Sequence, residues 1–351
     1  MATSGTVGAT VFTTRKVIEH AYQRCRINPE QLTPQRLQVA QDLLFLRLSA
    51  LANKGEPLWA VVKDILPLYV GKQSVPTDVG TVNILNANLR RINRPSGTAS
   101  SSEGVAANAF DGDFSTACVE TLANGSITLQ YASATANPMY GLLPNASGTW
   151  NYSIQVSNDG VTWTTIYTAT AQAVVAGQWL WWDIEGVAAW TYYRLQASGG
   201  TILNVTELVF ANTPTEINLG QLNRDDYSAL PNKFLQGQPT SYWFDRQRSQ
   251  PVITLWPSPG DIAKLWNLVV YMHRQVQDVG SLSQELELRQ SAYLAVVFKL
   301  AADIAPEDKE VDVNLIPILV EQGKEAWDDF MDGESDDAPT TLTPNIGVYT
   351  R

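Results

Sequence analysis

Two oxygen-rich stretches, far apart in the chain, carry the residue types that a hard metal ion prefers. The first stretch runs from Asn108 to Thr116 and includes Asp111 and Asp113, and the second contains Thr206 and Glu207. A hard cation takes about six or seven oxygen ligands, which a tight Asp-Gly turn and a distant glutamate can supply together. An ordinary turn at Asp111-Gly112 and an edge residue at Glu207 explain the same residues, so both interpretations stay open.

Aromatic side chains gather in the same part of the chain. Trp179, Trp181 and Trp182 are numerous enough to stack on a glycan. Alternating aromatic residues more often fill the core of a β-sandwich. Glycan binding and core packing are therefore the two hypotheses for these tryptophans.

The sequence lacks the usual signatures of a catalytic site. His20 and His273 have neither a nearby Ser or Cys nucleophile motif nor an HExxH spacing, and no glycine-rich phosphate loop follows a predicted strand. The acidic run over 328–337 indicates a solvated surface. We expect no enzymatic activity, although a metal-dependent enzyme that uses Asp111 or Glu207 is a third hypothesis.

The elements that position these residues follow from two changes in composition, near Arg94 and near Pro214. Residues 95–212 contain one basic residue, Arg194, and eight acidic ones. Aromatic and β-branched residues alternate there with polar ones, which predicts a separate all-β domain. The charged, Leu-rich flanks predict the two halves of one interrupted host domain.

Helix signals outnumber strand signals in the flanks. Predicted helices cover about 13–26, 33–54, 58–66, 283–305 and 313–330, and predicted strands cover 82–89, 242–244, 252–256 and 265–271. The last three strands suggest a meander. We therefore expect an α+β fold, with a mainly helical host domain that carries a small antiparallel sheet and is interrupted by an all-β jelly-roll sandwich.

Charge is distributed unevenly along the chain, whose net charge is −11. Residues 1–94 carry 12 basic and 6 acidic side chains, whereas residues 213–351 carry 11 and 21. An acidic surface repels phosphates, which argues against a general nucleic-acid binder, while the basic first part suits an acidic partner or a neighbouring copy. A solvated surface without a partner is the simpler explanation of the same charges.

We expect no membrane association, because the apolar stretches are too short to span a bilayer and no export signal begins the chain.

Short turn motifs recur in order across both flanks. They are residues 75–79, 225–227, 230–233, 237–239, 242–245 and 255–259. Their order and spacing resemble the head-to-tail adaptor (connector) proteins of short-tailed bacteriophages. The resemblance implies a dodecameric ring beneath the portal that extends the DNA channel and attaches the tail. The implied partners are the portal protein, other copies of the chain, tail nozzle or fibre proteins, and double-stranded DNA that passes without specific binding. The implied location is the virion neck, assembled in the host bacterial cytoplasm.

The middle segment resembles a different family. Tyr152–Trp163, with an Asn-Asp-Gly turn, and Tyr192–Leu195 accompany the two oxygen-rich stretches. Together they resemble the discoidin-like modules, also called the coagulation factor type C or galactose-binding-like fold. The resemblance implies a structural calcium, held by side chains of Asp111, Thr116 and Glu207 and by carbonyls of Asn108, Asp113 and Thr206. Ala117-Cys118 stands where the family commonly places a tryptophan, which departs from its usual sugar-contacting edge.

These patterns divide the chain into three parts. Residues 1–94 and 215–335 are predicted to form the discontinuous adaptor domain, residues 95–214 the inserted sandwich, and residues 336–351 an extended tail. This tail either docks on a partner or is a frayed end held by lattice or assembly contacts. The docking residues proposed for the tail are Asp336, Asp337, Tyr349 and Arg351. We expect a structural adaptor that displays the sandwich outward and requires no cofactor. The alternative is a glycan-binding attachment protein that acts through the sandwich.

Overall fold

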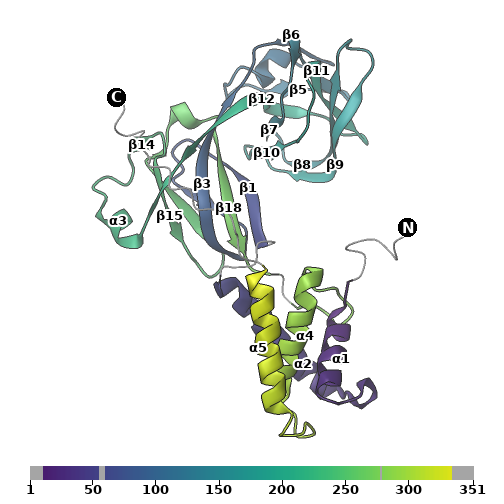
Figure 1. Cartoon of the computed structure of the whole chain (residues 1–351). Helices are drawn as coiled ribbons and strands as arrows, with labels where there is room; N and C mark the ends of the chain where they lie inside the picture. The colour runs from purple at the N-terminus through teal and green to yellow at the C-terminus, as the bar shows by residue number, and fades with distance from the viewer. Residues whose placement is uncertain (1–10, 55–59, 277–278, 334–351) are drawn as a thin grey trace. The chain divides into compact units, whose positions relative to one another are not determined.

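The computed structural model describes residues 11–54, 60–276 and 279–333, which belong to two compact units (Figure 1). The helical unit takes its residues from Met1–Val62 and His273–Arg351, and the β unit is Lys63–Met272. The first and last parts of the chain therefore fold together. None of the described helices is both long and apolar enough to cross a membrane.

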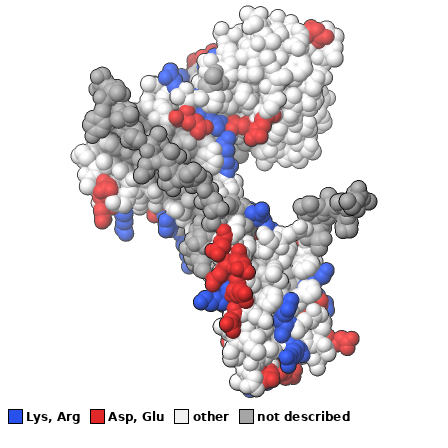
Figure 2. Space-filling view, viewed as in Figure 1, with Lys and Arg blue, Asp and Glu red and all other residues white. Residues whose placement is uncertain are grey.

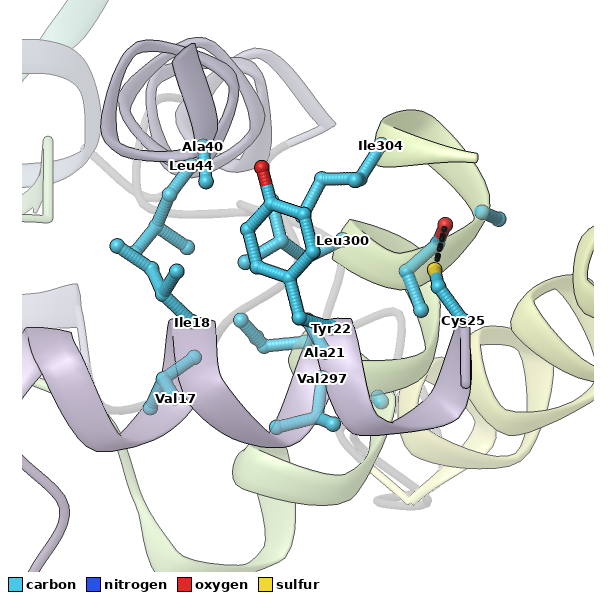
Figure 3. Packing of buried hydrophobic residues seen from close by; sticks show 14 of the residues in the cluster. Val17, Ile18, Ala21, Tyr22, Cys25, Ala40, Leu44, Val297, Leu300 and Ile304 are labelled. Atoms are coloured by element: carbon cyan, nitrogen blue, oxygen red, sulfur yellow. Dashed lines mark hydrogen bonds between the residues drawn. The ribbon is translucent and has the colours of Figure 1, made fainter. Parts of the chain in front are cut away.

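Four helices build the described part of the helical unit. They are α1 (Thr14–Arg24), α2 (Pro34–Lys54), α4 (Gln290–Ile304) and α5 (Ile316–Asp332), with a 3-10 turn η1 (Pro29–Gln31) between the first two. Ile18 and Tyr22 of α1 pack between Leu44 of α2 and Leu300 of α4 (Figure 3). All four side chains are buried, so the core joins the two ends of the sequence. The hydroxyl of Thr13 caps α1 and accepts the backbone N–H of Lys16 at 3.3 Å.

The last helix pair begins later than the sequence predicts. Residues 283–289 were expected to be helical, but α4 begins at Gln290. The backbone carbonyls of Leu282 and Gln284 instead accept the N–H groups of Arg15 and Thr14 at 3.0 and 2.9 Å. The first turn of any helix leaves its N–H groups without intrahelical partners, and this segment supplies two of the missing acceptors.

The β unit contains four sheets. The strands are β1 (Val61–Pro67), β2 (Ser74–Pro76), β3 (Thr81–Asn93), β4 (Thr98–Ser101), β5 (Cys118–Val119), β6 (Ser126–Thr135), β7 (Met139–Pro144), β8 (Gly148–Ser157), β9 (Thr164–Val174), β10 (Leu180–Asp183), β11 (Trp190–Ser198), β12 (Asn204–Asn218), β13 (Gly220–Leu222), β14 (Gln236–Gly237), β15 (Ser241–Asp245), β16 (Val252–Trp256), β17 (Ser258–Pro259) and β18 (Asn267–Arg274). Short helical segments are η3 (Ala106–Ala109), α3 (Arg224–Ala229) and η4 (Asp261–Ala263). The sheet orders are β1-β18-β3-β12-β7-β10 with β5 on β12, β4-β6-β11-β8-β9, β13-β15-β16-β2 and β14-β17.

The predicted sandwich is present. Its five-stranded sheet faces β7 and β12, and the space between is filled by aromatic side chains that include Tyr140, Tyr193 and Phe210. Alternation along β11 is regular, because Tyr193, Leu195 and Ala197 are buried while the residues between them are partly exposed. The Asn-Asp-Gly segment forms the predicted hairpin turn between β8 and β9.

Strands contribute more to the host than the sequence predicts, so a mainly helical host domain is not confirmed. The helix expected over 58–66 is wrong, since residues 61–66 belong to β1, where β-branched Val61, Val62 and Ile65 favour a strand. The meander is correct for β15 and β16, which pair antiparallel. Its third strand, β18, lies between β1 and β3 instead and is buried on both faces.

One strand belongs both to the sandwich and to the host sheet. β12 pairs with β7 over Val205–Ala211 and with β3 over Asn212–Asn218. The predicted boundary after residue 214 therefore falls inside a continuous strand. The insertion is joined to its host through the backbone hydrogen bonds of β12 rather than through a flexible linker.

Candidate functional site

Polar side chains line the outer face of the five-stranded sheet. Register places Ser100, Thr128, Arg194, Gln155 and Thr165 in one row across β4, β6, β11, β8 and β9. Hydroxyl and amide groups both donate and accept hydrogen bonds, so a row of them can bind a polar ligand. The sandwich surface seen in Figure 2 carries few charged side chains.

Arg194 is the centre of this row. Its Nε and Nη2 donate to Oε1 of Gln155 at 2.8 and 2.6 Å. The guanidinium carbon lies 3.8 Å from the centre of the Trp163 ring, a cation–π contact. The Tyr192 ring meets Trp163 edge-on, with centroids 6.3 Å apart. Two aromatic rings, an amide and a cation thus gather on one face of the sheet.

The charge of Arg194 has no counter-charge nearby. Among the described residues its contacts are with Gln155 and Trp163, and none is an ion pair. Partial burial lowers the pKa of the guanidinium from its usual value. The site therefore holds a half-buried cation whose Nη1 group has no hydrogen-bond partner in the described part of the chain.

The hairpin turn holds Trp163 close to the sheet. Oδ1 of Asp159 accepts the N–H groups of Val161 and Thr162 at 2.8 and 2.7 Å, and these bonds hold the pKa of the carboxyl well below its usual range. Gly160 has a φ of 72°, which favours glycine. The turn therefore fixes the start of β9 beside Tyr192.

The three tryptophans proposed from the sequence lie elsewhere. Trp179 is 5% exposed and stacks on Trp181 with centroids 4.8 Å apart. The backbone N–H of Trp179 donates to the hydroxyl of Tyr69 at 2.9 Å. Trp182 packs among core aromatics, 5.3 Å from Tyr167 between ring centres. Neighbouring side chains engage all three rings, so we place the glycan hypothesis on the sheet face instead.

The side chains of the first oxygen-rich stretch form hydrogen bonds within that stretch. Oδ1 of Asp111 accepts the N–H of Asp113 at 2.8 Å, and Oδ2 accepts the hydroxyl of Thr116 at 2.9 Å. The same hydroxyl lies 3.0 Å from the carbonyl of Asp113 and 3.5 Å from that of Asn108. Four of the six predicted calcium ligands therefore converge.

Glu207 reaches this loop from β12, next to Thr206. It is fully buried, and its Oε2 accepts the N–H of Gly112 at 3.0 Å. Its Oε1 lies 2.5 Å from Nη1 of Arg94. Burial raises the pKa of this carboxyl to about 7, an effect that Arg94 opposes. A cation thus already contacts Glu207, and a calcium ion would have to compete with it.

The donor set is suited to calcium in kind, but its carboxylates are engaged within the protein. The described residues contain no group of three or more His, Cys, Asp or Glu side chains placed to hold a metal ion. Calcium at these six residues stays a prediction. The predicted docking residues Asp336, Asp337, Tyr349 and Arg351 lie outside the described residues.

Sequence reasoning did not select the Trp163, Tyr192 and Gln155 cluster. Its one available signal was Arg194, the single basic residue of the acidic segment 95–212. The outward position of Arg194 followed from period-two alternation. The side chains that surround it come from β8, from β11 and from the turn before β9, and the pairing of these strands is known only from the structure.

Comparison with known proteins finds no matching sequence family and no matching curated protein. Solved structures similar to part of the chain include the CBM32 of AlyQ in complex with 4,5-unsaturated mannuronic acid, with 18% identity, 34% of this chain and 99% of that chain covered, and a TM-score of 0.31. Chitosan-binding module 1 of a chitosanase/glucanase from Paenibacillus sp. IK-5 is 24% identical, the match covers 34% of this chain and 97% of that chain, and the TM-score is 0.29. CBM62 from Clostridium thermocellum Xyl5A is 22% identical, the match covers 35% of this chain and 98% of that chain, and the TM-score is 0.31.

These neighbours are carbohydrate-binding modules, and each covers about a third of the chain. Nothing in the comparisons supports the phage adaptor inferred from the flanks.

Proposed function

We propose that the chain binds a glycan through the outer face of the five-stranded sheet. The observation that carries this proposal is the cluster of Trp163, Tyr192, Arg194 and Gln155 on a face otherwise lined by hydroxyl and amide groups. Sugars present apolar C–H faces to aromatic rings and hydroxyl groups to polar side chains. Binding sites that combine an aromatic surface with a few fixed polar groups provide both kinds of contact.

A glycan array probed with the full chain tests the proposal. We expect binding to a subset of glycans, weakened at least tenfold by Trp163→Ala or Tyr192→Ala. Phe234→Ala is the matched control, because Phe234 is 86% exposed and lies on the loop before β14, outside the sandwich. Unchanged binding in both cluster variants would place the site elsewhere.

A second candidate, the ring-forming phage adaptor in the virion neck, is favoured by the surface of the helical unit. Leu46 of α2, Leu294 of α4 and Ile318 of α5 are 62%, 59% and 50% exposed. Exposed apolar side chains on several helices suit contacts with other copies or with a portal protein. Light scattering of the purified chain, alone and with its cognate portal, tests this candidate. A monomer that does not bind the portal would overturn it.

A further inference from the structure

We propose that the glycan bound by the sheet face is acidic and that Arg194 binds its carboxylate. This inference rests on the proposed function and specifies its ligand class. The segment around Arg194 is otherwise acidic, with eight acidic residues between 95 and 212 and no second basic one. A single cation at the centre of a ligand-binding face, in a domain that repels anions elsewhere, suits a ligand with one negative group at a defined position.

The donors of the guanidinium point to the same chemistry. Arginine carries five N–H groups in a planar fork that matches a carboxylate with two parallel hydrogen bonds. Gln155 accepts from Nε and Nη2, and Nη1 has no partner among the described residues. The fork is therefore oriented by Gln155, and it retains donors for a ligand.

The aromatic contact makes this arginine rigid before a ligand arrives. Trp163 covers one face of the guanidinium at 3.8 Å, which removes much of the side-chain freedom that binding would otherwise have to restrict. A half-buried cation without a counter-ion is costly, and an incoming carboxylate offsets that cost. Both effects favour an anionic ligand over a neutral one of the same shape.

The neighbouring residues suit the remainder of a sugar chain. Thr128 and Thr165 lie on either side of the Arg194–Gln155 pair in the same row. Their hydroxyls can accept and donate hydrogen bonds to sugar hydroxyls. Tyr192 lies beside Trp163 and extends the aromatic surface. The carboxylate would thus be bound at Arg194 and the uncharged ring atoms beside it.

The test compares acidic polysaccharides with their carboxyl-reduced, neutral counterparts. The probes are polygalacturonate, polymannuronate, hyaluronan and polysialic acid, each titrated against the full chain by calorimetry. We expect at least one acidic polymer to bind about tenfold or more tightly than its reduced form. Arg194→Gln should abolish this difference, whereas Arg224→Gln, which removes an exposed positive charge from α3, should leave it unchanged.

The outcomes separate this inference from the proposed function. Equal binding of acidic and reduced polymers, still weakened by Trp163→Ala, would overturn the acidic ligand and keep the glycan site. No binding to any polymer, together with a blank glycan array, would overturn both. An Arg194→Gln variant with unchanged thermal unfolding and an unchanged preference for acidic polymer would also overturn the role of Arg194.

Discussion

Glu207 has an unusual carboxyl group, because it is buried and its pKa is raised. Burial raises its pKa to about 7 although Arg94 contacts it, because both its oxygens are removed from water. An unfolded glutamate titrates near pH 4.3. Between these pH values the Glu207 carboxyl keeps its proton in the folded chain but has lost it in the unfolded chain. The stability that this carboxyl contributes is therefore fully present below about pH 4.3 and is lost as the pH rises through about 7.

Glu207→Gln should remove that pH dependence. We expect the free energy of unfolding of the natural chain to fall relative to the variant by about 3 kcal/mol between about pH 4 and about pH 8. Urea unfolding monitored by tryptophan fluorescence at several pH values measures this difference. Parallel profiles for the two proteins would show that Glu207 titrates alike in the folded and unfolded chains.

The same contact predicts how calcium acts. Arg94→Ala removes the guanidinium from Glu207 and leaves its carboxyl without a cation beside the loop of Asp111, Asp113 and Thr116. Calcium binds oxygen ligands and should replace the lost charge. We therefore expect calcium to raise the melting temperature of Arg94→Ala more than that of the natural chain, as measured by differential scanning fluorimetry with and without chelator. An equal calcium response in both proteins would contradict this competition.

At the scale of the element, the hairpin between β8 and β9 connects sequence to site. Gly160 has a positive φ of 72°, and a Cβ there would lie 3.3 Å from the Tyr192 ring. Gly160→Ala should destabilise the sandwich by about 1–2 kcal/mol from backbone strain. It should also weaken glycan binding, because Tyr192 must shift. Gly177→Ala, at a φ of 73° with open space around it, is the matched control for strain alone.

Elements whose signals are local could be predicted, and those defined by distant partners could not. Asn158-Asp159-Gly160 specifies its turn within three residues, and Thr13, the residue directly before α1, caps that helix. β1 and β18 have apolar patterns that fit several arrangements, and only pairing within the large sheet decides among them. The candidate site was missed for the same reason, since Trp163 of the β8–β9 turn meets Arg194 of β11 only once the sheet has formed.

At the scale of the molecule, the two units should unfold separately, because each has a core of its own. Leu300 is fully buried in the helical unit and Leu195 is fully buried in the sandwich. Replacing a buried leucine by alanine costs roughly 2–5 kcal/mol, so each substitution should lower the melting temperature of one unit by several degrees. Differential scanning calorimetry should then show two transitions.

The pair of substitutions distinguishes independent units from a single cooperative structure. Leu300→Ala should shift one calorimetric transition and Leu195→Ala the other, because a cavity destabilises the core that contains it. If both variants moved the same transition by similar amounts, the chain would unfold as one body. In the expected case, Leu300→Ala leaves the sandwich folded at temperatures where the helical unit has melted. Glycan binding measured there would show whether the sheet face recognises its ligand without the helices.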